Sequence, residues 1–280
     1  MLDSSPHFQL IELDAVTSTN TFLAAYQPQQ GTDLTLVTAE YQTAGRGQTG
    51  NTWESERGKN LLFSLLLHPT FLPPSHLFLL SEAIALAIRN AVDSFLGNPQ
   101  FPLETNASAT PCHPAVSVKW PNDIYVGDRK IAGILMENEL SGRYVERCII
   151  GCGVNINQAD FHSDAPNPVS LRQLLGHDTT RMLVLDTIIT HFRHYYADIQ
   201  ASFAASTSAQ DQTASLTSSL HTAYRSFLYR REGLHPYLDA SSPTPFLAEI
   251  ADVEPSGHLL LRDTSGHIHR YAFKEVSFVV

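Results

Sequence analysis

Hydrophobic residues recur along this chain with two spacings, one typical of strands and the other typical of helices. Strands are predicted at residues 8–16, 34–42, 60–68, 116–120, 123–126, 130–140 and 144–157, and helices at 19–26, 74–96, 170–176 and 180–203. The continuous apolar run at 60–68 indicates a strand that is buried on both faces. This mixture of strands and helices predicts an α/β (α+β) fold.

The pattern changes after Gly233, where short strands replace the longer elements. Strands are predicted at 245–253, 257–263, 267–273 and 276–280, separated by turn signals such as Ser256-Gly257 and Ser265-Gly266. We therefore expect a large domain over residues 1–232 and a small β-barrel domain over 233–280. Residues 97–115 are predicted to form a surface loop, and residues 204–219, rich in Ser, Thr and Ala, a solvated linker.

Composition narrows the class of protein. The chain has 280 residues, of which 43% are hydrophobic and 16% charged, so it can bury a sizeable core and is not disordered. Its formal net charge of −10 argues against bulk electrostatic attraction to nucleic acid or to an anionic membrane. A small anionic ligand remains compatible with this charge, because a local pair of Lys and Arg is enough to bind it.

The cysteines and the apolar segments indicate a cytoplasmic protein. Cys112, Cys148 and Cys152 are odd in number and match no disulfide scaffold, which favours a reducing compartment. Cys148 and Cys152 lie in an apolar run and are predicted to be buried structural thiols. The N-terminus lacks the features of a signal peptide, and prolines together with His68 interrupt the most apolar stretch, 61–88.

The most informative polar cluster is KWPND at residues 119–123, which is followed by KIAGIL from Lys130. Lys119 and Lys130 stand in otherwise apolar β segments, so solvated surface charge explains them poorly. Gly133 would allow the strand backbone to approach a ligand closely. The cluster suggests a ligand that is anionic at one end and planar or polar at the other.

A second cluster, GRGQTG at residues 45–50, formally matches the glycine pattern of dinucleotide-binding folds. The context excludes that function, because no helix opens after the last glycine and no acidic residue closes a second strand. The kinase and P-loop patterns are absent as well. What remains is a flexible basic loop in which backbone N–H groups can approach an anion, Arg46 can bind two oxygens, and Trp53 offers a flat face to a heterocycle.

Taken in chain order, four motifs resemble those of biotin–protein ligase, also called biotin–[acetyl-CoA-carboxylase] ligase. They are STN at 18–20, AEYQTAGRGQTGNTW at 39–53, KWPNDIYVGDRKIAGIL at 119–135 and GCGVNIN at 151–157. The resemblance is strong over residues 8–160, and the β-rich tail is similar to the family's small C-terminal domain. It implies a catalytic domain with a mixed β-sheet flanked by helices, of the class II aminoacyl-tRNA synthetase/biotin ligase type, and a small C-terminal SH3-like β-barrel.

The resemblance implies an enzyme that makes biotinyl-5′-AMP from biotin and MgATP and then transfers biotin to one lysine of a biotin carboxyl carrier protein. The first step brings a carboxylate onto a phosphate, so the site must neutralise two anions. By resemblance, Lys130 and Arg46 are the catalytic cations. The implied biotin-binding residues are Ser18, Thr19, Asn20, Gln42, Gly45, Arg46, Gly47, Gln48, Lys130 and Gly133. The implied ATP-binding residues are Arg46, Trp53, Asn122, Asp123, Lys130 and Asn155.

Several assignments stay open at this point. Ser18 and Thr19 could instead cap the predicted helix at 19–26, and Asp123 could place either the metal or the acceptor lysine. Mg²⁺ is expected to arrive with ATP, and no protein metal ligand is assigned, because the 13 histidines show no HExxH or zinc-finger spacing. The resemblance is compatible with a monomer and with a homodimer.

The sequence departs from the family pattern in two respects. The loop of the family usually reads GRGRxGRxW, whereas Gln48 and Asn51 stand here in place of the two later arginines. The first of these arginines helps family members to retain the adenylate, so we expect other groups to perform that function in this chain. Few residues precede Ser18, too few for the winged-helix domain of the bifunctional members, and we expect no DNA-binding repressor activity.

Two rival functions remain. A lipoate–protein ligase or octanoyltransferase shares the catalytic fold, but the combination of the glycine loop with KWPNDI favours biotin. A non-catalytic biotin- or nucleotide-binding regulator is the other alternative. Lys130 and Arg46 argue against it, because a binding module does not need to neutralise two anions.

Overall fold

The computed structural model describes residues 8–48, 51–97, 114–142, 144–163, 166–204 and 212–279, with the backbone alone over 212–218. Its strands are β1 (Phe8–Leu13), β2 (Leu34–Ala39), β3 (Leu61–Leu67), β4 (Val116–Lys119), β5 (Asp123–Val126), β6 (Arg129–Ser141), β7 (Tyr144–Val154), β8 (His235–Asp239), β9 (Phe246–Val253), β10 (Leu259–Asp263), β11 (Ile268–Tyr271) and β12 (Val276–Phe278). Its helices are α1 (Thr19–Ala25), the short 3-10 helix η1 (Pro74–His76), α2 (Phe78–Phe95), α3 (Leu171–Leu175), α4 (Arg181–Ala204) and α5 (Gln212–Ser226). Most of the predicted loop at 97–115, including Cys112, lies outside the described residues.

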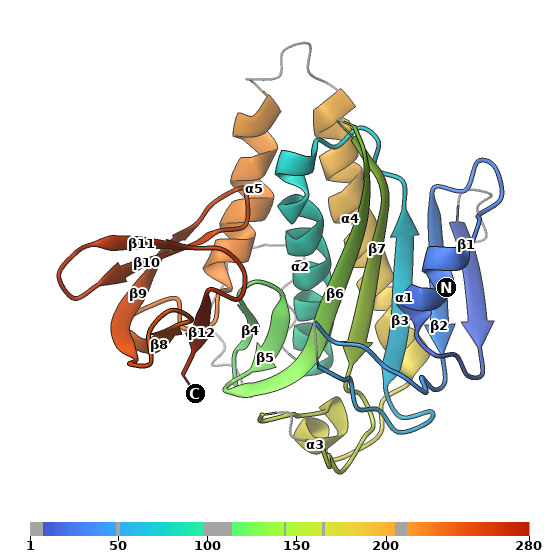
Figure 1. The fold of residues 1–280 in the computed structure, drawn as a ribbon. Helices are drawn as coiled ribbons and strands as arrows, with labels where there is room; N and C mark the ends of the chain where they lie inside the picture. The colour runs from blue at the N-terminus through green and yellow to red at the C-terminus, as the bar shows by residue number, and fades with distance from the viewer. Residues whose placement is uncertain are drawn as a thin grey trace.

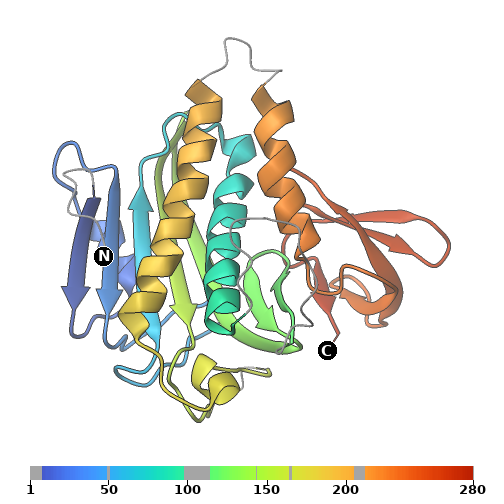
Figure 2. The same cartoon turned by 180° about the vertical axis from the view of Figure 1, so that it is seen from behind.

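The larger sheet has seven strands in the order β1-β2-β3-β7-β6-β5-β4 (Figure 1). β1 and β2 pair in parallel, and the remaining neighbours pair in antiparallel fashion. Helices α2, α4 and α5 cover one face, as the view from behind shows (Figure 2), and α1 packs on the other. This arrangement confirms the predicted mixed sheet, and it explains why β3 is buried at every position.

Helix α2 lies at the centre of the helical layer, with α4 on one side and α5 on the other (Figure 2). Nearly all of its side chains are buried for this reason, including the polar Glu82, Arg89 and Asp93. By length and composition, the segment Pro74–Phe95 could cross a membrane, but 78% of its most apolar 18-residue window is buried inside the protein. Cys148 and Cys152 are buried and free, as predicted, and burial raises the pKa of the Cys148 thiol to about 12.

The prediction of a solvated linker at 204–219 is wrong in its second part, because residues from Gln212 onward belong to helix α5. The Ser- and Thr-rich composition suggested a linker, since these residues have only modest helix propensity. Tertiary packing overrides that preference. Leu220 and Tyr224, four residues apart and therefore on one helical face, are buried in the main core.

The C-terminal strands form a five-stranded antiparallel sheet in the order β11-β10-β9-β8-β12. Strand β8 was not among the predicted strands. The sheet contacts the larger unit at Trp120, whose Nε1 donates to the Gly257 carbonyl oxygen at 2.9 Å. Gly257 has a φ of +87°, and a Cβ at this position would lie 2.7 Å from the Phe78 ring. A glycine is therefore required where the turn between β9 and β10 meets helix α2.

A buried ionisable pair connects helix α2, helix α5 and the C-terminal sheet. His221 Nδ1 lies 2.6 Å from Glu82 Oε1, and Arg225, one turn further along α5, binds Asp252 of β9 at 2.9 Å. The hydrogen bond to Glu82 raises the pKa of His221, and burial raises the pKa of Glu82. Both groups therefore bind a proton more tightly in the folded chain than in the unfolded chain.

We expect the free energy of unfolding to fall as the pH rises above 6.5, the ordinary pKa of histidine. The contribution of His221 is fully present below that value and is lost as the pH rises through its raised pKa. Urea denaturation at a series of pH values measures this slope, and His221→Gln should flatten it. Equal slopes for the native chain and the variant would contradict the expectation.

Candidate functional site

A cavity of about 210 Å³ opens over the middle of strands β6 and β7. Its walls come from the start of α1, the glycine loop and the turn between β4 and β5. Its lining residues are Ser18, Thr19, Asn20, Gln42, Arg46, Gly47, Gln48, Asn51, Thr52, Trp53, Trp120, Pro121, Asn122, Asp123, Lys130, Gly133, Ile134, Leu135, Gly151, Cys152, Gly153 and Phe273. The fold thus brings together five segments that are far apart in the sequence, the last of which contributes Phe273 alone.

Of the residues predicted to bind biotin or ATP, all but Gly45 and Asn155 line this cavity. Gly45, the first residue of the glycine loop, packs against Trp53. An added Cβ at Gly45 would lie 2.7 Å from the Trp53 carbonyl oxygen. Asn155 is 3% exposed, and its Nδ2 donates to the Val169 carbonyl oxygen at 3.1 Å. Asn155 therefore holds the segment before helix α3, and its predicted contact with the adenylate stays a prediction.

Three glycines form the floor of the cavity on the paired strands β6 and β7. An added Cβ at Gly153 would lie 2.3 Å from the Trp53 ring, and one at Gly133 would lie 2.9 Å from it. A Cβ at Gly151 would lie 2.1 Å from the Asn20 side-chain oxygen. The glycines thus let the side chains of Trp53 and Asn20 lie directly on the sheet. Sequence reasoning singled out Gly133 alone, although glycine at alternate positions of a buried strand marks one open face.

A chain of hydrogen bonds runs along one wall of the cavity. Gln42 Oε1 accepts from the Thr19 backbone N–H at 2.8 Å, and Ser64 Oγ lies 2.7 Å from Thr19 Oγ1. Ser64 also donates to Asn20 Oδ1 at 2.6 Å, and Asn20 Nδ2 donates to Glu137 at 2.7 Å. Ser64 and Glu137 were missed by sequence reasoning, because Ser64 is a lone hydroxyl in an apolar strand and Glu137 lies in the polar end of β6, outside the recognised clusters. The Ser18 side chain makes no cap hydrogen bond to α1, so the capping alternative gains no support from this residue.

Both predicted cations are paired with carboxylates. Lys130 Nζ lies 2.7 Å from Asp123 Oδ2, with the two side chains 27% and 29% exposed, and 5.7 Å from the centre of the Trp53 ring. Arg46 binds Glu137 at 2.9 Å in a more exposed position. Asp123 therefore holds Lys130 in place. The sequence pointed to the metal or the acceptor lysine as the partner of Asp123 and did not predict this ion pair.

Two polar atoms in the wall of the cavity are buried and find no hydrogen-bond partner among the described residues: Asn122 Oδ1 and Trp53 Nε1. The Asn122 side chain is oriented by its Nδ2, which donates to the Ile134 carbonyl oxygen at 3.3 Å. Buried polar atoms are satisfied in most structures, so these two atoms are exceptions within the described residues.

Lys119 and Trp120 have structural roles and contact the C-terminal sheet. Lys119 does not line the cavity; its Nζ donates to Tyr125 Oη at 3.1 Å and lies over the Phe278 ring of the C-terminal sheet. Burial lowers the pKa of Lys119. Trp120 lines the cavity but directs its N–H to Gly257. The first two residues of KWPND therefore attach the C-terminal sheet, while Asn122 and Asp123 face the cavity.

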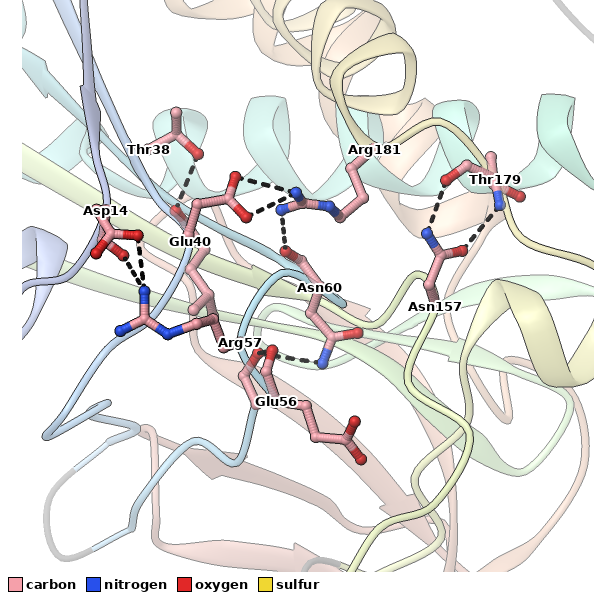
Figure 3. A network of polar contacts seen from close by, with 11 residues as sticks. Asp14, Thr38, Glu40, Glu56, Arg57, Asn60, Asn157, Thr179 and Arg181 are labelled. Atoms are coloured by element: carbon pink, nitrogen blue, oxygen red, sulfur yellow. Dashed lines mark hydrogen bonds and ion pairs between the residues drawn. The ribbon is translucent and has the colours of Figure 1, made fainter.

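The described residues of the glycine loop and of the segment after it form a small ribbon. The Gly47 N–H donates to the Asn51 carbonyl oxygen at 2.9 Å, and the Trp53 N–H donates to the Gly45 carbonyl oxygen at 3.1 Å. Beyond the loop, Arg57 binds Asp14 and Glu40 binds Arg181 (Figure 3). In the same network, the backbone carbonyl oxygen of Asn60 accepts from Arg181, and its Nδ2 donates to Ser55 and Gln158. The base of the loop is therefore rigidly held.

Comparison with known proteins places this geometry in a family. The Biotin/lipoate A/B protein ligase family matches residues 12–155. The bifunctional ligase/repressor BirA of Bacillus subtilis is 31% identical over 192 residues, which cover 68% of this chain and 54% of that protein. The biotin–[acetyl-CoA-carboxylase] ligase of Mycobacterium tuberculosis is 32% identical over 168 residues, which cover 58% of this chain and 56% of that one. The chain thus spans about half the length of these curated relatives.

Solved structures agree in fold. The biotin protein ligase of Aquifex aeolicus in complex with biotin and ATP superposes with a TM-score of 0.71 at 23% identity, covering 96% of this chain and 97% of that one. The enzyme of Leishmania major in complex with biotinyl-5-AMP gives 0.59 at 24% identity, covering 96% and 99%. These likenesses confirm the predicted fold class, including a C-terminal sheet consistent with an SH3-like domain. Because the family match spans more than half of the chain, this protein belongs to the Biotin/lipoate A/B protein ligase family.

Proposed function

We propose that this chain is an ATP-dependent biotin–protein ligase, which converts biotin to biotinyl-5′-AMP and transfers biotin to a lysine of a biotin carboxyl carrier protein. The observation that carries the proposal is that Lys130 and Arg46, from distant parts of the sequence, line one cavity together with Trp53 and Asn122. The names of the relatives and the ligands of the Aquifex aeolicus structure support biotin and ATP as its substrates.

In the first step, a carboxylate oxygen of biotin forms a bond to the α-phosphorus of ATP, and pyrophosphate leaves. Two anions must approach each other, so the barrier falls when fixed cations compensate their charge. Lys130 is suited to this role, because its Nζ is held 2.7 Å from Asp123 Oδ2 before any ligand binds. The side chain is therefore already ordered and loses little conformational entropy when the substrates bind. Arg46 adds a second cation that can bind two oxygens at once.

In the second step, the amine of the carrier lysine forms a bond to the acyl carbon of biotinyl-5′-AMP, and AMP leaves. The enzyme need not supply a nucleophile. Asp123 is the sole carboxylate among the described residues that line the cavity. We infer that it serves the acceptor lysine or the metal in addition to holding Lys130.

Mg²⁺ would enter bound to the phosphates of ATP and supply further charge compensation there. The residues fit a metal that is carried in this way, because Mg²⁺ in nucleotide sites usually takes only one or two protein carboxylates. Asp123 can provide one such oxygen. Within the described residues, no group of three or more His, Cys, Asp or Glu side chains could hold a metal ion independently.

We also propose a cytoplasmic location. The two described cysteines, Cys148 and Cys152, are buried as free thiols, which supports a protein of a reducing compartment. Cell fractionation with an antibody to the chain would test this proposal.

The function is tested by incubating the purified chain with ATP, biotin and a purified biotin carboxyl carrier domain. Mass spectrometry should show one added biotinyl group on one lysine, with release of pyrophosphate. Thermal stabilisation by biotin but not by lipoate supports the assignment independently. Transfer of lipoate or octanoate instead would identify the rival enzyme, and binding of biotin without pyrophosphate release would identify a regulator.

We expect the enzyme to retain its adenylate despite Gln48 and Asn51. The Gly47 N–H donates to the Asn51 carbonyl oxygen and the Asn51 N–H donates to the Gln48 carbonyl oxygen, so backbone contacts close the described part of the loop without the two arginines. The measurement is the amount of free biotinyl-5′-AMP and of biotin on an added bystander protein such as albumin. Heavy labelling of the bystander would show that these substitutions open the site.

A further inference from the structure

Glu137 of strand β6 connects two of the residues that line the cavity, although it does not itself line it. Its Oε2 accepts from Asn20 Nδ2 at 2.7 Å and from Arg46 Nη2 at 2.9 Å, and its Oε1 lies 3.2 Å from the same Arg46 nitrogen. One carboxylate thus holds the first turn of helix α1 and the glycine loop against the same strand.

The contact with Asn20 completes a fixed geometry. Asn20 Nδ2 donates to Glu137 and to the Leu135 carbonyl oxygen, while Asn20 Oδ1 accepts from Ser64. Both amide hydrogens are therefore used within the protein, and Asn20 is 2% exposed. Asn20 is thus a structural residue in the wall of the cavity, and its orientation depends on the carboxylate of Glu137.

The contact with Arg46 determines where the charge of the loop lies. Arg46 is the single charged residue between Gly45 and Trp53. Its side chain is 44% exposed, so packing alone does not hold it. The backbone bonds of the ribbon shape the loop itself, whereas the ion pair with Glu137 attaches the loop to the sheet beside the cavity.

We propose that Glu137 is a positioning residue, which sets the glycine loop and its Arg46 cation at the edge of the cavity and orients Asn20 beside them. The positive charge is then in place before an anionic ligand enters, so less ordering is needed on binding. The effect on catalysis rests on the proposed ligase function, whereas the effect on the loop does not.

The chain contains a matched control on the same strand. Glu139 lies two residues further along β6, on the same face, and pairs with Arg147 at 3.7 Å with its own side chain 56% exposed. Glu137→Gln and Glu139→Gln remove the same charge from the same strand with the same change in shape. Only the former removes the carboxylate that Asn20 and Arg46 share.

The first measurement is limited proteolysis of the full chain by trypsin without added ligand, with cleavage after Arg46 followed by mass spectrometry. We expect Glu137→Gln to accelerate this cleavage several-fold and Glu139→Gln to leave its rate unchanged. This readout requires no turnover. Equal rates for the two variants would overturn the proposal even if the ligase function is correct.

The second measurement is steady-state kinetics with biotin, ATP and a carrier domain. For Glu137→Gln we expect the KM for biotin to rise about tenfold, with a much smaller change in kcat, since a hydrogen bond to a charged group is worth roughly that factor. In an Arg46→Gln background, Glu137→Gln should add little further loss, because it acts largely through Arg46. Full additivity, or a lower KM in the single variant, would overturn the proposal.

Discussion

Replacing Lys130 by alanine is expected to slow the formation of biotinyl-5′-AMP by about 10²–10³-fold, the effect typical of removing one preorganised charge-stabilising group. Lys130 Nζ lies in the wall of the cavity, 2.7 Å from Asp123 and beside the Trp53 ring. Without it, the carboxylate of biotin and the α-phosphate of ATP approach each other with one compensating charge fewer. The measurement is the single-turnover rate of pyrophosphate release.

The matched control is Lys119→Met. Lys119 belongs to the same cluster and the same end of the sheet, but it points to Tyr125 and Phe278 and does not line the cavity. This variant should lower thermal stability while leaving the rate of pyrophosphate release within a few-fold of the native rate. If Lys130→Ala were as active as Lys119→Met, the assignment of the catalytic cation would be wrong.

Replacing Gly153 by alanine should destabilise the protein by about 1–3 kcal/mol, the usual cost of overpacking a close contact. The added methyl group would lie 2.3 Å from the Trp53 ring, well inside van der Waals distance. The indole cannot move closer to the sheet, because it already packs on Gly133 of the neighbouring strand. Urea denaturation measures the loss, and the KM for ATP should rise, because Trp53 is one of the predicted ATP-binding residues.

A double-mutant cycle separates this clash from a general weakening of strand β7. In a Trp53→Ala background the ring is gone, so Gly153→Ala should cost far less than it does in the native chain. Equal costs in the two backgrounds would show that the methyl group disturbs the strand itself. Gly151→Ala offers an independent case, because its methyl group would meet Asn20 in place of Trp53.

Both predictions depend on contacts between distant segments, and the sequence allowed only some of the residues in these contacts to be predicted. Lys130 and Gly133 were identified because a charge and a glycine are conspicuous in an apolar β segment. Ser64 was not, since a lone hydroxyl in a buried strand is usually a packing residue. Its importance arises from the pairing of β3 with β7 and from the position of α1 over them, which brings Asn20 within 2.6 Å.

Helix α5 shows the opposite kind of error, in which local composition pointed away from the observed structure. Its polar residues indicated a linker, but a helix needs only one face with apolar contacts to form on a folded core. Leu220 and Tyr224 provide that face against α2. The packing role of these two residues could not be predicted from the sequence, because it depends on the position of α2 in the fold.

The sequence by itself determined the order and type of most elements, the family and the chemical groups of the cavity, because spacing, glycine loops and charged residues in apolar strands act locally. Only the tertiary structure decided which groups meet: Lys130 with Asp123, Arg46 with Glu137, Trp53 with Gly153, and Trp120 with the C-terminal sheet. Asp123, Lys130 and Glu137 lie on strands of the sheet, so a register shift of one residue would turn their side chains to the other face and separate these partners.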